Sequence, residues 1–391
     1  MGHPPLKPII RLALLAAMVL PMVGSACNPT PARETVAPSS FHPTDSPFLF
    51  TPTLTPTFLP TLTRAASPAP THPPQPAPSP DSSRATLQPL TISAATAASL
   101  VQTGQISFTP WDMILALAWS PDGKRIACAA GEVVTLYSPT LEELRRFRVG
   151  VWTTSLAFDP QSRLLAAGGK DGTIRVWDIE QGELVAEISA HQKGVNALTF
   201  SPDSDLLASA GNDGYARLWE PHTTKKQIDL IGGTYAVPSI AFVHRGRSLA
   251  IANGAVIRLR DVESGRFVTT YRTQESSYSL AVSPNGELLA VGTSANRIYL
   301  WQLTGEDEPL ILSPPNAPPA LVWSLSFSPD GSLMVSGGSD HILRLWDVNK
   351  GALLAAYSAH QGAITSLAFR PDGCCLLSGG LDGVLRFWTV R

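Results

Sequence analysis

Short runs of alternating apolar and polar residues, each closed by turn-forming residues, fill the chain from about residue 91 to residue 391. In the clearest copy, the alternating run Val322–Phe327 leads into the turn Ser328-Pro-Asp-Gly. A second apolar run, Leu333–Ser336, is followed by a Gly-Gly-Ser-Asp turn and by a third run, Ile342–Trp346. Alternation with a period of two is typical of β-strands, and such turns reverse the chain. The pattern therefore predicts a unit of three antiparallel strands.

The same unit recurs seven times. Its first turn lies at Ser120-Pro-Asp-Gly, Asp159-Pro-Gln-Ser, Ser201-Pro-Asp-Ser, Val243-His-Arg-Gly, Ser283-Pro-Asn-Gly, Ser328-Pro-Asp-Gly and Arg370-Pro-Asp-Gly. Its third strand ends at Tyr137, Trp177, Trp219, Arg260, Trp301, Trp346 and Trp388, so that successive ends lie 40, 42, 41, 41, 45 and 42 residues apart. A regular period of this length indicates a repeat architecture with about four strands per unit. Fourth strands are predicted at Glu183–Ile188, Gln227–Leu230, Arg266–Tyr271, Pro309–Leu312 and Leu353–Tyr357.

The repeat resembles the WD-repeat β-propeller family. The likeness rests on Trp177-Asp178, Trp346-Asp347, Ala190-His191, Ala359-His360 and the Pro-Asp-Gly turns, and it covers about residues 95–391. The resemblance implies an all-β, seven-bladed propeller of four-stranded antiparallel blades at 91–391. The seventh unit has no fourth strand after Trp388, and we expect Ser99–Ile106 to pair with its open edge and to close the ring.

The resemblance also implies a structural tetrad, a buried chain of hydrogen bonds from Trp through Ser and His to Asp. Two sets fit its spacing: His191, Ser209, Asp213 and Trp219, and His360, Ser378, Asp382 and Trp388. Blade six keeps Ser336, Asp340 and Trp346 but has Pro319 near the histidine position, and blade two has Ala167 in place of serine. The alternative is a hydrolase triad, which we do not favour because two similar sets recur at repeat spacing without an oxyanion loop.

Composition narrows the function further. A net charge of −2 argues against nucleic acid as a partner. No phosphate loop or metal motif is present, and we predict no catalytic residue, no metal and no cofactor. Cys128 is interpreted as a small core residue, and Cys374-Cys375 as two thiols or a strained vicinal disulfide.

The first residues are interpreted as a signal peptide at 1–26. Lys7 and Arg11 precede the apolar run Leu12–Val23, and small residues stand before Cys27. This is similar to a bacterial lipobox, although Gly24 replaces the usual leucine. The resemblance implies a lipidated Cys27 on the outer face of the cytoplasmic membrane, in the cell envelope. The alternative is an ordinary secretory signal.

The segment 27–90 is predicted to be an extended, disordered tether. Sixteen of residues 28–90 are proline, interleaved with Thr, Ser and Ala. Proline fixes φ and removes backbone donors, so that neither a helix nor a sheet can run through such a segment.

A closed ring without catalytic chemistry is most often a binding platform. The family's partner-binding positions map to loops on one face of the ring: Trp152, Thr154, Lys170, Asn196, Asn212, Tyr278, Trp323, Ser339 and Leu381. We predict a monomeric, surface-tethered, non-catalytic scaffold with an unidentified protein partner. One alternative is an extracytoplasmic receptor for a small molecule or glycan at the channel mouth. Another interpretation is that Trp152 and Trp323 are simply packed under neighbouring loops.

Overall fold

The computed structural model describes residues 90–109, 111–203, 205–222, 225–231, 235–305 and 308–390. The expected signal peptide, Cys27 and the tether, apart from Leu90, lie outside the described residues. Within these ranges, no helix combines the length and the apolar character that a membrane span needs.

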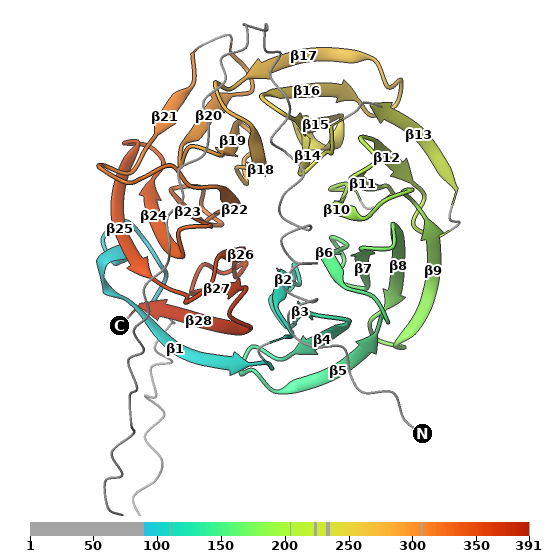
Figure 1. Ribbon diagram of the computed structural model, residues 1–391, viewed down its shortest axis with the longest axis horizontal. Helices are drawn as coiled ribbons and strands as arrows, with labels where there is room; N and C mark the ends of the chain where they lie inside the picture. Colours follow the sequence, from blue (N-terminus) through green and yellow to red (C-terminus); the bar gives the residue numbers. More distant parts are fainter. Residues whose placement is uncertain are drawn as a thin grey trace, which may run out of the picture. The chain divides into compact units, whose positions relative to one another are not determined.

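The described chain forms seven four-stranded antiparallel sheets that follow one another around a ring (Figure 1). The first three sheets are β2 (Ile114–Trp119), β3 (Ile126–Ala130), β4 (Val133–Tyr137) and β5 (Glu143–Arg148); β6 (Thr153–Phe158), β7 (Leu164–Gly169), β8 (Thr173–Asp178) and β9 (Glu183–Ser189); and β10 (Val195–Phe200), β11 (Leu207–Gly211), β12 (Ala216–Trp219) and β13 (Lys226–Ile231). The next three are β14 (Ile240–Val243), β15 (Ser248–Asn253), β16 (Val256–Asp261) and β17 (Phe267–Arg272); β18 (Ser277–Val282), β19 (Leu288–Thr293), β20 (Ile298–Gln302) and β21 (Leu310–Leu312); and β22 (Val322–Phe327), β23 (Leu333–Gly338), β24 (Ile342–Asp347) and β25 (Ala352–Ser358). The seventh consists of β26 (Ile364–Phe369), β27 (Cys375–Gly380), β28 (Val384–Val390) and β1 (Leu100–Ser107). We call these sheets blades one to seven, and the predicted seven-bladed propeller is confirmed.

The alternation in the sequence is explained by where each strand lies in its blade. The second strands, such as β7 and β23, are buried along their whole length because both faces pack against neighbouring blades. The fourth strands lie at the rim and alternate between buried and exposed residues, as β9 does. The predicted fourth strands are present, with ends shifted by at most one residue. The first strands of all seven blades surround the axis (Figure 1).

The turn between the first and second strands is built by its own side chains. In blade one, the Ser120 hydroxyl accepts a hydrogen bond from the Arg125 amide at 2.9 Å, and the Asp122 carboxylate accepts one from the Lys124 amide at 3.0 Å. Gly123 has φ of 68°, a left-handed conformation that glycine adopts without strain. The Ser-Pro-Asp-Gly sequence thus encodes this turn locally. The turns between the first and second strands lie on the face of the ring opposite to the loops between the second and third strands.

The seventh blade takes its fourth strand from the start of the described chain. β1 pairs antiparallel with β28, with Leu100 opposite Val390. This strand lies one residue later than the predicted Ser99–Ile106 and follows a short 3₁₀ helix, η1 (Ala97–Ser99). The segment before it is also attached to the ring, because the Ile92 amide donates to the Gly373 carbonyl at 2.9 Å.

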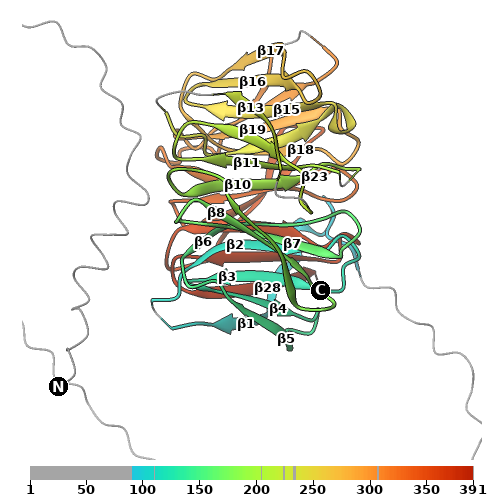
Figure 2. The same ribbon diagram turned by 90° about the vertical axis from the view of Figure 1, so that its right-hand side faces the viewer.

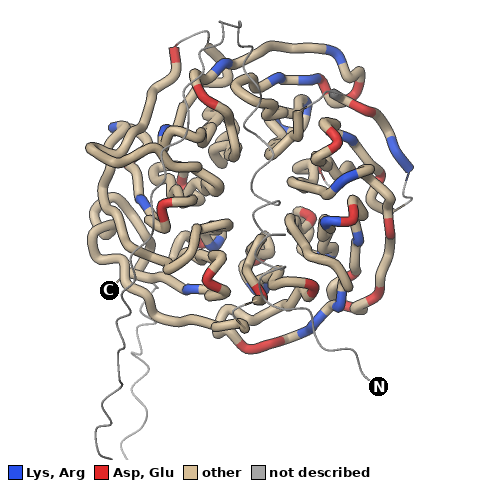
Figure 3. The backbone as a smooth tube through the Cα atoms, viewed as in Figure 1, with Lys and Arg blue, Asp and Glu red and all other residues tan. Residues whose placement is uncertain are grey.

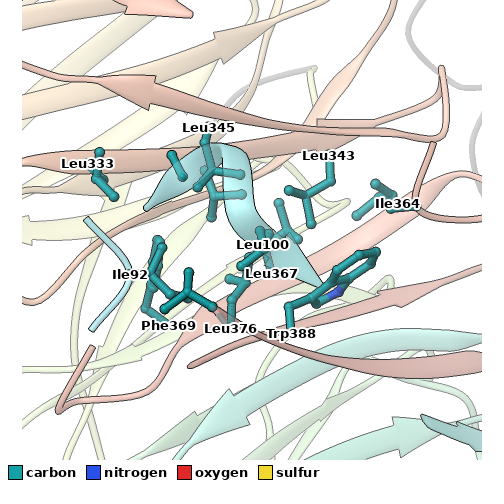
Figure 4. Close-up of a cluster of buried hydrophobic side chains, with 14 residues drawn as sticks. Ile92, Leu100, Leu333, Leu343, Leu345, Ile364, Leu367, Phe369, Leu376 and Trp388 are labelled. Carbon is teal, nitrogen blue, oxygen red and sulfur yellow. The ribbon is translucent and has the colours of Figure 1, made fainter. Parts of the chain in front are cut away.

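Ile92 and Leu100 are buried beside Trp388 and Leu345, in a core shared by blades six and seven (Figure 4). The Tyr357 hydroxyl donates to the Ala97 carbonyl at 2.7 Å, which ties this segment to the outer strand of blade six. Turning the view by 90° shows the sheets edge-on, with β1 and β5 at one side of the ring and β17 at the other (Figure 2).

Candidate functional site

The tetrad residues of blade three form a continuous chain of hydrogen bonds. The Trp219 indole donates to Ser209 Oγ at 2.8 Å, and Ser209 Oγ lies 2.8 Å from His191 Nε2. His191 Nδ1 lies 2.8 Å from Asp213 Oδ1. The guanidinium of Arg217 donates to the second oxygen of Asp213 at 2.8 Å, an arginine that the sequence analysis did not include.

Blade seven repeats this arrangement with the second predicted set. Trp388 donates to Ser378 Oγ at 2.9 Å, Ser378 Oγ lies 2.7 Å from His360 Nε2, and His360 Nδ1 lies 2.9 Å from Asp382 Oδ1. Arg386 donates to the other Asp382 oxygen at 3.0 Å. The arginines stand four residues after each aspartate, and this spacing is the signal that would have found them.

Burial determines the protonation of these groups. Burial lowers the pKa of His191 and His360, so that both rings are neutral at pH 7. Burial alone would raise the pKa of Asp213 and Asp382, but hydrogen bonds from the histidine and the arginine lower it overall. The neutral ring then carries its proton on Nδ1 and donates to Asp, while Nε2 accepts from the serine hydroxyl. The Trp, Ser, His and Asp side chains of each tetrad are thus all hydrogen-bonded.

The geometry argues against a hydrolase triad. The Ser209 and Ser378 side chains are fully buried, and each hydroxyl also accepts from a tryptophan indole. A nucleophile must reach its substrate, and these two hydroxyls lie inside the sheet.

The other blades keep only parts of the network. In blade six, Trp346 donates to Ser336 at 2.9 Å, but Asp340 accepts from Asn296 of blade five at 3.1 Å instead of from a histidine. Asn296 adopts φ of 61° and also donates to the Pro318 carbonyl at 3.2 Å, which places it where the histidine is missing. The sequence pattern did not reveal that Asn296 takes the place of the histidine, because Asn296 belongs to blade five and Asp340 to blade six.

The predicted partner-binding positions come together at the ends of the first and second strands. Backbone amides of Lys170, Asn212, Ser339 and Leu381 donate to the carbonyls of Trp152, Gly194, Leu321 and Ala363, at 2.9 to 3.0 Å. The two loops that carry these positions are therefore held side by side in blades two, three, six and seven. Lys170 is exposed at this face, although partial burial lowers its pKa.

Two of these positions connect one blade to the next. Thr154 donates to the Gly168 carbonyl at 3.0 Å and to the Val195 carbonyl of blade three. Asn196 donates to the Val237 carbonyl at 3.1 Å and to Asn212 at 2.9 Å. Their hydrogen-bonding groups are used within the ring. Ser339 is also engaged, because its hydroxyl accepts from the Leu321 amide at 2.8 Å.

In blades five and six, aromatic residues occupy the position that Thr154 and Asn196 hold in blades two and three. Tyr278 and Trp323, on the adjacent strands β18 and β22, are half-buried, and burial raises the pKa of Tyr278. Trp152 of blade two is also half-buried. Within the described part of the chain, neither the Trp152 nor the Trp323 indole donates a hydrogen bond. This differs from Trp219, Trp346 and Trp388, each of which donates to a serine.

A cavity of about 550 Å³ lies at the opposite ends of the strands, between blades two and three. Asp159, Asp205, Leu206 and His222 are among its lining residues, and the sequence analysis did not predict it. Nowhere in the described ranges do three or more His, Cys, Asp or Glu side chains gather as a metal site would require. Cys374 and Cys375 are free thiols with sulfurs 3.3 Å apart, so the alternative of a vicinal disulfide is wrong for this structure.

Comparison with known proteins agrees with the propeller topology. Residues 124–379 match the family described as nucleolar protein 10-like, N-terminal domain. The chain belongs to this family of WD40-type β-propellers. Similar proteins include nuclear distribution protein nudF of Emericella nidulans, 30% identical over 161 residues, and that of Aspergillus niger, 28% identical over 157 residues. The first alignment covers 39% of this chain and 36% of the relative, and the second 38% and 35%. The chain thus spans about a third of the length of these curated relatives.

Proposed function

We propose that the protein is a non-catalytic protein-interaction scaffold whose binding face contains Tyr278 and Trp323. The observation that carries the proposal is the pair of aromatic side chains on adjacent first strands, at a position where other blades place hydrogen-bonded Thr154 or Asn196. Large aromatic side chains supply much of the energy of protein interfaces, and a free indole donor can bond to a partner.

We further propose that the scaffold is held at the outer surface of the cytoplasmic membrane by a lipidated Cys27. The support is the basic and apolar pattern before Cys27 and the proline-rich segment that separates it from the propeller. Labelling with a fatty-acid analogue should mark the wild type and not Cys27→Ala. Equal labelling of the two proteins would overturn the anchor.

The binding face is tested with the full chain and the native cell envelope. Chemical cross-linking and pull-down should recover a specific protein with the wild type, and Tyr278→Ala with Trp323→Ala should lose it while the melting temperature stays near that of the wild type. The control is Trp111→Ala, an exposed tryptophan in the loop before β2 of blade one and so away from blades five and six. Capture that survives the double variant would exclude this face. Loss of folding in the double variant would show that the two rings are structural.

The same variants distinguish a scaffold from a receptor for a small molecule or glycan at the channel mouth. A small ligand raises the melting temperature by mass action without capturing a protein. A metabolite or glycan that stabilises the wild type and not the double variant would assign the face to the receptor.

A further inference from the structure

Blade four differs from every other blade in its charge. Residues 240–272 contain six arginines and two acidic residues, a net charge of +4, in a chain whose total is −2. Counted over their strands and turns, the other six blades carry between −3 and +1. Figure 3 shows the basic segments along β16 and β17 at this part of the ring. We call the six residues the arginine surface: Arg245, Arg247, Arg258, Arg260, Arg266 and Arg272.

The arginines of blade four are not used in ion pairs. Elsewhere in the ring, arginines pair with nearby carboxylates, as Arg175 does with Asp171 and Arg344 with Asp340. Over the described ranges, none of the six guanidinium groups in the arginine surface takes part in an ion pair. Arg260 makes one long hydrogen bond, 3.4 Å, to the Gly265 carbonyl, and its buried Nε has no partner. Ion pairs within the ring therefore do not explain why six arginines gather in blade four.

Three of the arginines project from one face of the outer half of the blade. Arg258 lies opposite Thr270, and Arg272 lies opposite Val256, in the register between β16 and β17. Arg260 follows Arg258 by two residues on β16, so both side chains point to the same face of the sheet. Cross-strand partners also share a face, which places Arg272 with them. Arg266 directly precedes β17, and Arg272 ends it, so that a cation stands at each end of the outermost strand.

Exposed apolar side chains accompany this charge. Phe267 is 57% exposed and Val268 is 45% exposed, and Phe267 lies opposite Arg260 in the register. Arginine and aromatic residues are the types enriched in protein interfaces, where they combine bidentate carboxylate recognition with apolar burial.

We propose that the outer edge of blade four is a second protein-interaction surface, and that it binds an acidic polypeptide segment that carries a large apolar side chain. A strand of six residues such as β17 spans about 20 Å, which fits a short segment. Blade one carries +1 and the other five blades are neutral or acidic, so the rest of the ring offers a long polyanion no comparable positive charge.

The occupant is another molecule. The chain's own segment 27–90 contains three acidic and three basic residues and so offers no complementary charge. This surface goes beyond the proposed binding face, since Tyr278 and Trp323 belong to blades five and six.

The test measures the fluorescence anisotropy of a labelled 12-residue peptide of glutamates around one phenylalanine, titrated with the full chain. Arg266→Glu with Arg272→Glu should weaken binding at least tenfold. The matched control is Lys124→Glu with Arg148→Glu, two exposed cations on blade one, across the ring from blade four (Figures 1 and 2). The control changes the net charge by the same amount and should alter the affinity less than twofold.

A second comparison tests the apolar part. Phe267→Ser should weaken the phenylalanine peptide several-fold and leave a peptide with alanine at that position unaffected. Tyr278→Ala with Trp323→Ala should leave both affinities unchanged, so that failure of this surface and failure of the proposed binding face can be told apart. If the charge-reversal variant melts early, Arg266→Gln with Arg272→Gln replaces it, with a smaller loss expected.

Several results would overturn the proposal. Equal weakening in the blade-one control would mean that only net charge matters. Blade-four-dependent binding of a single-stranded oligonucleotide or of phosphatidylglycerol vesicles, without binding of the peptide, would assign the surface to another class of molecule. Concentration-dependent self-association in sedimentation that disappears with Arg266→Glu and Arg272→Glu would make a second copy of the chain the occupant instead.

Discussion

Blades seven and four have the same four-stranded topology, yet they place their polar residues differently. Blade seven turns His360, Ser378 and Asp382 inward, where each is hydrogen-bonded. In blade four only Gly254 and Ala255 separate β15 from β16, so the loop is one residue shorter than Leu381–Gly383 and has no aspartate. The fold therefore does not require the tetrad.

Apolar packing takes the place of the network in blade four. Leu249 and Ile251 of β15 pack against blade three, and Ile257 and Leu259 of β16 pack against blade five. All four are fully buried. Fully burying such a side chain contributes about 1.5 to 3 kcal/mol, which is comparable with what a hydrogen-bonded pair contributes net. Four of the arginines of this blade, Arg245, Arg247, Arg266 and Arg272, are exposed to solvent.

The largest effect is expected where blade seven is completed by β1. Deletion of residues 90–107 removes a strand, uncovers Trp388 and leaves the edge of β28 unpaired. An unpaired edge next to exposed core promotes aggregation. We expect aggregation or a melting temperature lower by well over 10 °C, measured by sedimentation velocity and thermal denaturation. Melting like that of the intact chain would show that blade seven does not depend on β1.

The next effect tests the tryptophan at the end of the network. Trp388→Ala removes a buried indole and leaves Ser378 without one donor. The expected loss is about 3 to 5 kcal/mol in the free energy of unfolding. Urea denaturation measures it, with Trp111→Ala as the control, because Trp111 is 42% exposed and should cost less than about 1 kcal/mol. Similar losses in the two variants would contradict the assigned repeat register.

The tetrad histidines should make the stability of blades three and seven depend on pH, whereas blade four has no tetrad histidine. Burial lowers the pKa of His191 and His360, so that below pH 6.5 the unfolded chain binds protons that the folded chain does not. Stability must then fall with falling pH, by at most about 1.4 kcal/mol per pH unit for each histidine. The lowered pKa of Asp213 and Asp382 adds a further loss below about pH 4, in the same direction.

Denaturation of the wild type between pH 7 and pH 5 measures the histidine part of this loss. His191→Gln with His360→Gln is the matched variant, and it should lower stability at pH 7 and flatten the pH dependence. A double variant as acid-sensitive as the wild type would mean that other groups are responsible.

The fold could be predicted from the sequence because the residues that form the turns and strands of a repeat lie within that repeat. Ser-Pro-Asp-Gly forms the first turn with its own side chains, and the tryptophans mark the third strands. The tetrad partners were also predictable, since their spacing is fixed within one blade. Contacts between blades were not. Asn296 reaches Asp340, and Thr154 reaches Val195, across about 41 to 44 residues, and no local pattern encodes such a pairing. For the same reason, a position predicted to bind a partner was found to connect two blades.

The smallest effect is expected at the position in blade four that corresponds to Trp388. Arg260 is the second-to-last residue of the third strand, β16, and it has one weak hydrogen bond and a buried Nε without a partner. Arg260→Met keeps the apolar stem and removes the unsatisfied donor, so the lost bond and the relieved desolvation oppose each other. The free energy of unfolding should change by less than about 1 kcal/mol, measured by urea denaturation beside Trp388→Ala. A loss as large as that of Trp388→Ala would mean that Arg260 supports blade four as the tryptophan supports blade seven, and that the arginine is structural. A small change would leave Arg260 available to the acidic partner, whose affinity should fall in the same variant.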